Sequence, residues 1–225
     1  MRLELNVPSA PTPAAKLLPL FHSLADAVVD IACKTASAEG KSISCSKGCG
    51  ACCRQLVPIS AVEARRLRQL LDELPAARAA ELRARFADAR VRLADAGLLE
   101  ALLEPERIGD EQAQAFGLEY FARGIACPFL EDESCSIHAE RPVACREYLV
   151  TSPAAHCARP SAASVDRVKM PAKVGSAVRK LQPPAWVPLI VAPEWADAHP
   201  DESPARPGPE IVGEFFSTLT GKELK

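Results

Sequence analysis

The stretch CSKGCGACC, residues 45–53, holds four cysteines within nine positions. Its first three cysteines have the spacing C-x3-C-x2-C, which lets three thiolates of one loop converge on a single inorganic centre. Gly48 and Gly50 allow the sharp, partly left-handed turns that such a loop needs. Because adjacent side chains usually diverge, Cys52 and Cys53 are not expected to serve one centre equally well. Cys53 therefore faces a second site or is a neighbouring thiol.

A second, looser group of cysteines lies further along the chain, with gaps of seven, nine and eleven residues. Zinc ribbons usually present two short C-x2-C knuckles, and only the step from Cys49 to Cys52 has that spacing. A loop around a bulky iron–sulfur cluster tolerates the irregular gaps better. Eight thiols are twice the four that tetrahedral zinc or one 4Fe–4S cluster requires, so the count permits two centres, or one centre with spare thiols. The second group consists of Cys127, Cys135, Cys145 and Cys157, and Cys33 stands alone.

Both groups together predict a metal site. Three thiolates of the first loop leave a four-coordinate centre one ligand short. Cys145 is the predicted fourth ligand, because Arg141-Pro142 forces a turn before it and Arg146 is placed to balance its charge. The predicted cofactor is a 4Fe–4S cluster; zinc is the alternative, and disulfides or free thiols are the third hypothesis. The candidate metal ligands are Cys45, Cys49, Cys52, Cys53, Cys127, Cys135, Cys145 and Cys157, and those of the main cluster are Cys45, Cys49, Cys52 and Cys145.

Composition indicates a globular protein of a reducing compartment. Of 225 residues 48% are hydrophobic, and the net charge of −2 with interspersed signs gives no footprint for nucleic acid and no basic membrane patch. Glu4 and three prolines stand where a secretory signal needs an apolar run. We therefore expect a cytoplasmic protein. Thiols stay reduced there, so clustered cysteines point to metal or redox chemistry more than to disulfides.

The hydrophobic pattern predicts a mainly α fold. Leucines and valines at three- and four-residue spacing predict a helix over 15–36, and a loop follows up to Arg54. Ser60 and Glu63 form a capping-box pattern at the start of a second helix. Pro75 separates this helix from the next, which gives an antiparallel hairpin. Further predicted elements are a helix over 110–123, short strands or turns around the second cysteine group, a helix over 166–181 interrupted near Pro171, and a closing helix over 210–220.

The predicted architecture is a helical hairpin with flanking helices around an irregular, metal-organised, cysteine-rich centre. Residues 1–14 are predicted to form a flexible N-terminal arm, and residues 15–181 a single helical cysteine-cluster domain. Residues 182–225 form a Pro-rich C-terminal extension packed on that domain. Within it, the tail over 182–209 is expected to run over the surface, with WVPLIV (186–191) as a strand or packing segment.

The two cysteine segments carry a family resemblance. CSKGCGACCR followed by CPFLEDESCSIHAERPVACR resembles the YkgJ-type cysteine-cluster family, a CxxCxxCC zinc- or iron-chelating domain related to a domain of bacterial flagellin lysine N-methylases. The resemblance spans about Cys45 to Cys157, although this chain has three residues in the first gap where the family name has two. It implies metal binding by these cysteines and, through the methylase relatives, an iron–sulfur cluster.

The chemistry of the centre suggests two classes of function. An iron–sulfur centre would serve electron transfer, redox sensing or the support of a partner enzyme, with a protein redox partner or client enzyme as the expected partner. A zinc-stabilised structural or interaction module is the alternative. C-x3-C-x2-C is also the spacing of radical-SAM enzymes, but the chain lacks the βα alternation of their barrel. No Ser/His/Asp triad, carboxylate pair or phosphate loop stands out, so no reaction is predicted.

Overall fold

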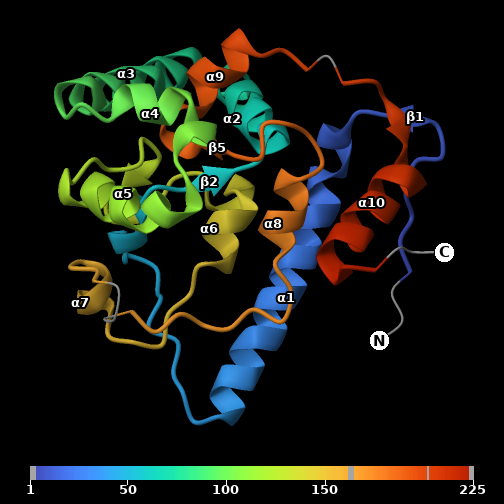
Figure 1. Cartoon of the computed structure of the whole chain (residues 1–225), viewed down its shortest axis with the longest axis horizontal. Coiled ribbons are helices and arrows are strands. Elements are labelled where there is room, and N and C mark those ends of the chain that lie inside the picture. The colour runs from blue at the N-terminus through green and yellow to red at the C-terminus, as the bar shows by residue number, and fades with distance from the viewer. Residues whose placement is uncertain (1–3, 162–164, 202, 223–225) are drawn as a thin grey trace.

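The computed structural model describes residues 4–161, 165–201 and 203–222. The fold is mainly helical, as predicted, with short two-residue strands (Figure 1). None of the described helices combines the length and apolar character needed to cross a bilayer. In chain order, the described elements are β1 (Pro11–Thr12), η1 (Ala14–Leu17), α1 (Leu18–Ala38), η2 (Ala51–Arg54), β2 (Pro58–Ile59), α2 (Ala61–Glu73), α3 (Ala76–Asp95), α4 (Leu99–Leu103), η3 (Pro105–Arg107), α5 (Asp110–Ala122), β3 (Leu130–Glu131), β4 (Ser134–Cys135), η4 (His138–Glu140), α6 (Val143–Glu147), α7 (Ala154–Cys157), α8 (Val174–Arg179), β5 (Val187–Pro188), η5 (Leu189–Val191), α9 (Ala192–Ala198), β6 (Arg206–Pro207) and α10 (Gly208–Thr220).

Helices α2 and α3 follow one another on either side of Pro75, as predicted. The hydroxyl of Ser60 accepts the N–H of Glu63 at 3.1 Å, and the Glu63 carboxylate accepts the N–H of Ser60 at 2.8 Å. This reciprocal pair is the predicted capping box, and it satisfies two N–H groups at the start of α2. Leu67 of α2 and Leu82 of α3 are buried in the same hydrophobic core.

The C-terminal tail completes this core. Strand β5 pairs antiparallel with β2, and α9 packs along α2. Val187, Leu189 and Ala192 are buried there, although the sequence led us to expect that most of residues 182–209 would lie on the surface. The segment WVPLIV, for which we predicted a strand or a packing segment, forms the short strand β5 and then η5. Its apolar side chains are buried because they are more stable when removed from water.

A second core joins the two ends of the chain. Phe21 of α1 and Phe215 of α10 are fully buried and stack with ring centroids 4.6 Å apart. Helix α8 packs against both helices, and β1 pairs antiparallel with β6 (Figure 1). Residues 1–3 of the predicted flexible arm lie outside the described residues. The division of the chain at residues 14 and 181 stays a prediction.

The helix predicted over 166–181 is present only as its last part, α8. Before it, Val168 donates its N–H to Leu149 O, and Thr151 donates its N–H to Asp166 O, both at 2.9 Å. This pairing requires extended backbone, and Pro171 lacks the N–H that a helix would use. The extended segment therefore braces residues 149–151, which connect α6 to α7.

Candidate metal centre

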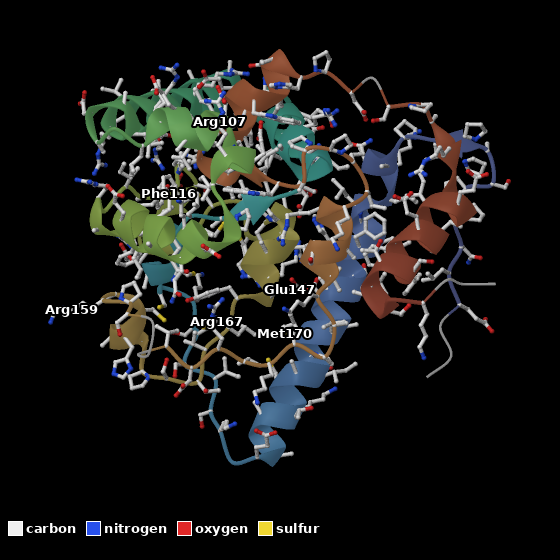
Figure 2. All side chains as sticks on the ribbon, viewed as in Figure 1. Arg107, Phe116, Glu147, Arg159, Arg167 and Met170 are labelled. Atoms are coloured by element: carbon white, nitrogen blue, oxygen red, sulfur yellow. The ribbon has the colours of Figure 1, made fainter. Side chains whose placement is uncertain are left out.

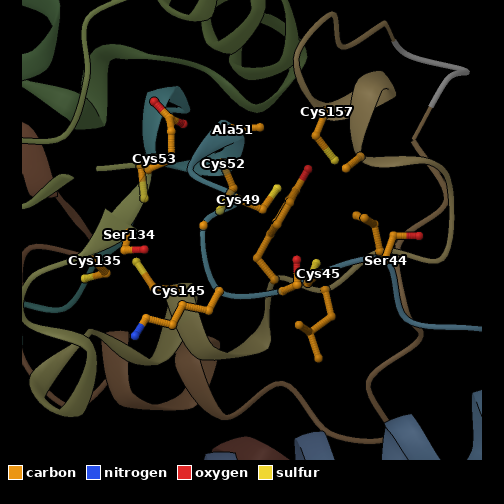
Figure 3. A pocket seen from close by; sticks show the side chains of 18 of the residues that line it. Ser44, Cys45, Cys49, Ala51, Cys52, Cys53, Ser134, Cys135, Cys145 and Cys157 are labelled. Atoms are coloured by element: carbon orange, nitrogen blue, oxygen red, sulfur yellow. The ribbon is translucent and has the colours of Figure 1, made fainter. Parts of the chain in front are cut away.

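Seven of the eight clustered cysteines line a cavity of about 670 Å³ (Figure 3). The eighth, Cys127, donates its backbone N–H to Cys53 O at 2.7 Å, so it adjoins the same site. Cys33 lies on α1 and is not part of the cavity wall. The structure thus brings the two cysteine groups together. The seven lining cysteines are Cys45, Cys49, Cys52, Cys53, Cys135, Cys145 and Cys157.

The first cysteine loop is held at both of its ends. At its start, the Ser44 N–H donates to Val150 O at 2.9 Å, and the Ser44 hydroxyl donates to Thr151 O at 3.3 Å. Gly48 has φ 87°, a left-handed conformation that favours glycine. At its end, the chain forms η2, which carries Cys52 and Cys53 into the cavity. The loop is therefore fixed to the segment that follows α6 and cannot swing freely from α1.

The second group reaches the cavity on three short elements. Asp132 and Glu133, at φ 46° and 55°, form the turn between β3 and β4, and Cys135 lies in β4. Cys145 lies in α6. Cys157 ends α7, which packs against η2. Short strands or turns were predicted for this region, and the two small helices were not.

The hairpin β3–β4 touches the first loop at Gly50. A Cβ added at Gly50 would lie 2.6 Å from Leu130 Cδ1, 2.6 Å from Glu133 Oε2 and 3.2 Å from Glu133 Cα. Arg54 donates across the same contact to both carboxylate oxygens of Glu133, at 2.6 and 2.9 Å, and to Gly50 O at 3.0 Å. Gly50 has φ −93°, so its role is close approach and not the left-handed turn that we predicted for both glycines.

We expect Gly50→Ala to lower the free energy of unfolding by about 1 kcal/mol, the lower end of the cost of an added methyl group in a packed contact. The side-chain ends of Leu130 and Glu133 must move aside and the Glu133 backbone must give slightly, so the pair of Glu133 with Arg54 and the metal content should both be reduced. Denaturant unfolding and metal analysis measure both effects. Gly117→Ala is the control: no atom lies within 4 Å of its added Cβ on α5, and it should raise stability by about 0.5–1 kcal/mol because alanine is favoured inside a helix. If Gly50→Ala is as stable as the wild type and keeps its metal, the close contact at Gly50 has no role.

Glu63 connects the helical hairpin to the helix that carries Cys145. Its side chain is buried, and its Oε2 accepts the N–H and the hydroxyl of Ser60 at 2.8 and 2.7 Å. Its Oε1 accepts the N–H of Val143, the first residue of α6, at 2.7 Å. Backbone N–H groups in a first helical turn have no partner inside the helix. The Glu63 carboxylate is the partner of the Val143 N–H, and so it fixes the start of α6.

Arg146 does not balance the charge of Cys145, contrary to our prediction. It is buried, does not line the cavity, and forms an ion pair with Asp26 of α1 at 2.8 Å. Its Nε donates to Arg141 O at 2.9 Å, so it fastens α6 to α1 and to the preceding turn. Arg141 lines the cavity instead, and its positive charge, with burial, lowers the pKa of His138 on the same wall.

The thiols of the site are mostly held neutral. Burial raises the pKa of Cys127 to about 12 and that of Cys145 well above its ordinary value. Cys52 is the exception: a hydrogen bond from the Cys53 thiol lowers the pKa of Cys52 to about 7, and the same bond raises that of Cys53. Several thiolates at this site would repel one another and lack hydration. A bound metal cation supplies the positive charge that they need.

The donor set fits a thiolate-ligated metal. Sulfur is a ligand preferred by zinc and by iron–sulfur clusters, and seven cysteines stand in the cavity wall. Within residues 4–161, 165–201 and 203–222, no three His, Cys, Asp or Glu side chains are yet arranged closely enough to hold an ion. Binding therefore requires the cysteine side chains to turn toward a common point. Rotation about χ1 between staggered positions provides that movement.

Tyr148 lines the cavity just after α6. Its hydroxyl accepts a hydrogen bond from Gln55 Nε2 at 2.9 Å, which links it to the chain just after η2. The guanidinium of Arg167, labelled in Figure 2, lies over its ring at 5.9 Å from the ring centroid. These two contacts fix the ring in the cavity wall.

The family comparison matches the cysteine segments. The model of the CxxCxxCC family, described as a "putative zinc- or iron-chelating domain", matches residues 44–163, more than half of the chain. No curated protein and no solved structure matches this chain. The matched range begins one residue before Cys45 and contains all eight cysteines of the two groups. The chain belongs to the CxxCxxCC family of metal-chelating cysteine-cluster domains.

Proposed function

We propose that the protein carries a 4Fe–4S centre in the cysteine-lined cavity and uses it in electron transfer or redox support of a partner enzyme. The observation that carries this proposal is the cavity itself. A structural zinc site is a closed tetrahedron of four ligands around one ion. A cavity of about 670 Å³, within the range of roughly 300–1,000 Å³ for small-ligand pockets, supports a bulkier centre with sulfur on several sides.

The surrounding residues suit a redox centre. Cys45, Cys49, Cys52 and Cys145 are the ligands that we predicted from sequence for the main cluster, and all four line the cavity. Lys47 and Arg141 also line it and bring positive charge toward the thiolates. Hydrogen bonds and charges near the sulfurs are what tunes the potential of a bound cluster. When bound, such a cluster supplies one-electron redox chemistry.

The cavity wall supports exchange of electrons with another protein. Cys45 and Cys49 are only partly buried, and residues 46–48 between them are exposed. A one-electron protein donor or acceptor could therefore approach this side. All nine cysteines are free thiols in the described chain. This state fits the cytoplasm, where we place the protein, since reduced thiols persist there.

A zinc-stabilised structural module is the second candidate. The segments around the cavity are mostly short and irregular, and few backbone hydrogen bonds join the first loop to the second cysteine group. An ion that fastens them would add its binding energy directly to folding. In that case the role would be structural or in protein interaction, without electron transfer.

Anaerobic purification followed by metal analysis, acid-labile sulfide analysis and an absorption spectrum distinguishes the two candidates. We expect brown protein that contains iron and sulfide and bleaches on chemical reduction. Colourless protein with stoichiometric zinc, obtained from cells supplied with both metals, would overturn the iron–sulfur proposal and support the structural one.

A further inference from the structure

Cys52 and Cys53, whose thiols are hydrogen-bonded to each other, mark the boundary between two sulfur-lined halves of the cavity. They are successive residues of η2, a 3-10 helix with three residues per turn, so their side chains leave the axis about 120° apart. Figure 3 shows Cys53 on the side of Cys135 and Cys145, and shows Cys45, Cys49 and Cys157 on the other side. The cavity thus has a sulfur-lined half on each side of η2.

Backbone contacts build each half separately. On the first side, Ser44 is bonded to Val150 just before α7, and α7 itself packs against η2. These contacts set Cys157 against the first cysteine loop. On the second side, the Cys127 N–H donates to Cys53 O, and the hairpin β3–β4 with Cys135 is held against Gly50 and Arg54. Each half therefore combines cysteines of both sequence groups.

The cysteines divide between the two halves by position. The C-x2-C step from Cys49 assigns Cys52, at the boundary, to the first half. Cys127 does not line the cavity, but its backbone N–H donates to Cys53 O, so it is the fourth cysteine of the second half. The other lining cysteines are Cys45, Cys49 and Cys157 on the first side, and Cys53, Cys135 and Cys145 on the second (Figure 3).

We infer that the cysteines form two adjoining four-thiolate centres, the first of Cys45, Cys49, Cys52 and Cys157 and the second of Cys53, Cys127, Cys135 and Cys145. Each centre holds its own 4Fe–4S cluster, and this identity rests on the proposed function. Four thiolates are what one such cluster takes. Cys52 would then ligate one cluster and the next residue, Cys53, the other, so the two clusters would be neighbours.

Iron content and magnetic coupling test the inference on the full-length, anaerobically reconstituted protein. We expect about eight iron and eight sulfide per chain, from two clusters of four. The electron paramagnetic resonance spectrum of the fully reduced protein should show splitting from two interacting spins. About four iron per chain and a single unsplit signal would overturn the two centres while leaving the proposed function intact. If only zinc binds, the proposed function fails; two zinc ions per chain would support the division, and one would overturn it.

Single substitutions test which cysteines belong to which centre. Cys157→Ser and Cys135→Ser should each keep about half of the iron and lose the spin coupling, while the double variant keeps none. Cys33→Ser is the matched control and should keep all of it. Circular dichroism shows whether each variant is folded. If a variant does not fold, the iron count of the wild type still tests the inference. If one single variant loses all iron and the other none, the cysteines form one centre and the inference is wrong.

Discussion

Metal-free protein is expected to be less stable than the loaded protein by roughly 5 kcal/mol or more, since binding free energies of structural metal sites reach about 10–16 kcal/mol and add to folding. Two parts of the chain far apart in sequence meet at the cavity. The direct backbone hydrogen bond between their cysteines is that of Cys127 to Cys53. Without a metal, the hairpin β3–β4 is held to η2 mainly by the partly exposed ion pair of Arg54 with Glu133 and the contact at Gly50, and such surface pairs contribute only about 0–1 kcal/mol.

Thermal unfolding of loaded and chelator-treated protein measures this difference. Hydrogen exchange should show that amides of η2, β3 and β4 lose protection first. The core of α1, α8 and α10 should retain more of its protection, because stacked Phe21 and Phe215 lie there, away from the cysteines. Reloading the metal must restore the melting temperature. A chelated, metal-free protein that melts at the temperature of the loaded protein would show that the centre is not a cross-link.

Glu63→Ala is expected to cost about 2–4 kcal/mol, because it removes the capping box and leaves the buried N–H of Val143 unpaired, which costs about 1–3 kcal/mol. The carboxylate accepts three hydrogen bonds, two from Ser60 and one from Val143, all at 2.7–2.8 Å. The capping box alone accounts for about 1 kcal/mol of that loss. The rest comes from the unpaired N–H of Val143, so α6 should loosen and Cys145 with it.

Equilibrium denaturation, together with metal retention, measures the effect of Glu63→Ala. Glu73→Ala on the same helix is the matched control: its pair with Arg66 is at the surface, and such pairs contribute about 0–1 kcal/mol. Glu63→Gln keeps part of the bonding and should fall between the two. A loss at Glu63 no larger than at Glu73 would mean that the bond to Val143 does not hold α6.

Local patterns predicted the long helices well, but they missed the short helices α6 and α7 and predicted too long a helix over 166–181. They also could not predict long-range contacts. The capping box of Ser60 and Glu63, the break at Pro75 and the helix that becomes α5 are all encoded within a few residues. The second bond of Glu63, to Val143, depends on where α6 packs, and no local pattern contains that. The same holds for the ion pair of Arg146 with Asp26, which spans 120 positions.

The candidate site was predictable in composition but not in arrangement. Cysteine clustering indicated that both groups would meet, and the structure places them around one cavity. Cys145 was predicted as the fourth ligand of the first loop, and the two-centre inference assigns that place to Cys157 instead. Turn geometry near Arg141 favoured Cys145, whereas the fold sets Cys157 beside that loop through α7 and the bonds of Ser44. Such placement follows from tertiary packing, which spacing along the chain does not encode.

Anomalous diffraction from anaerobically grown crystals of the loaded protein tests the central claim most directly, because it locates each metal atom among the sulfurs. We predict metal atoms in the cavity with thiolates of both cysteine groups as ligands, at metal–sulfur distances of about 2.3 Å. The first loop must contribute Cys45, Cys49 or Cys52, and the second group at least one of its four cysteines. Metal bound only by residues 45–53, or a second group paired into disulfides, would contradict the account.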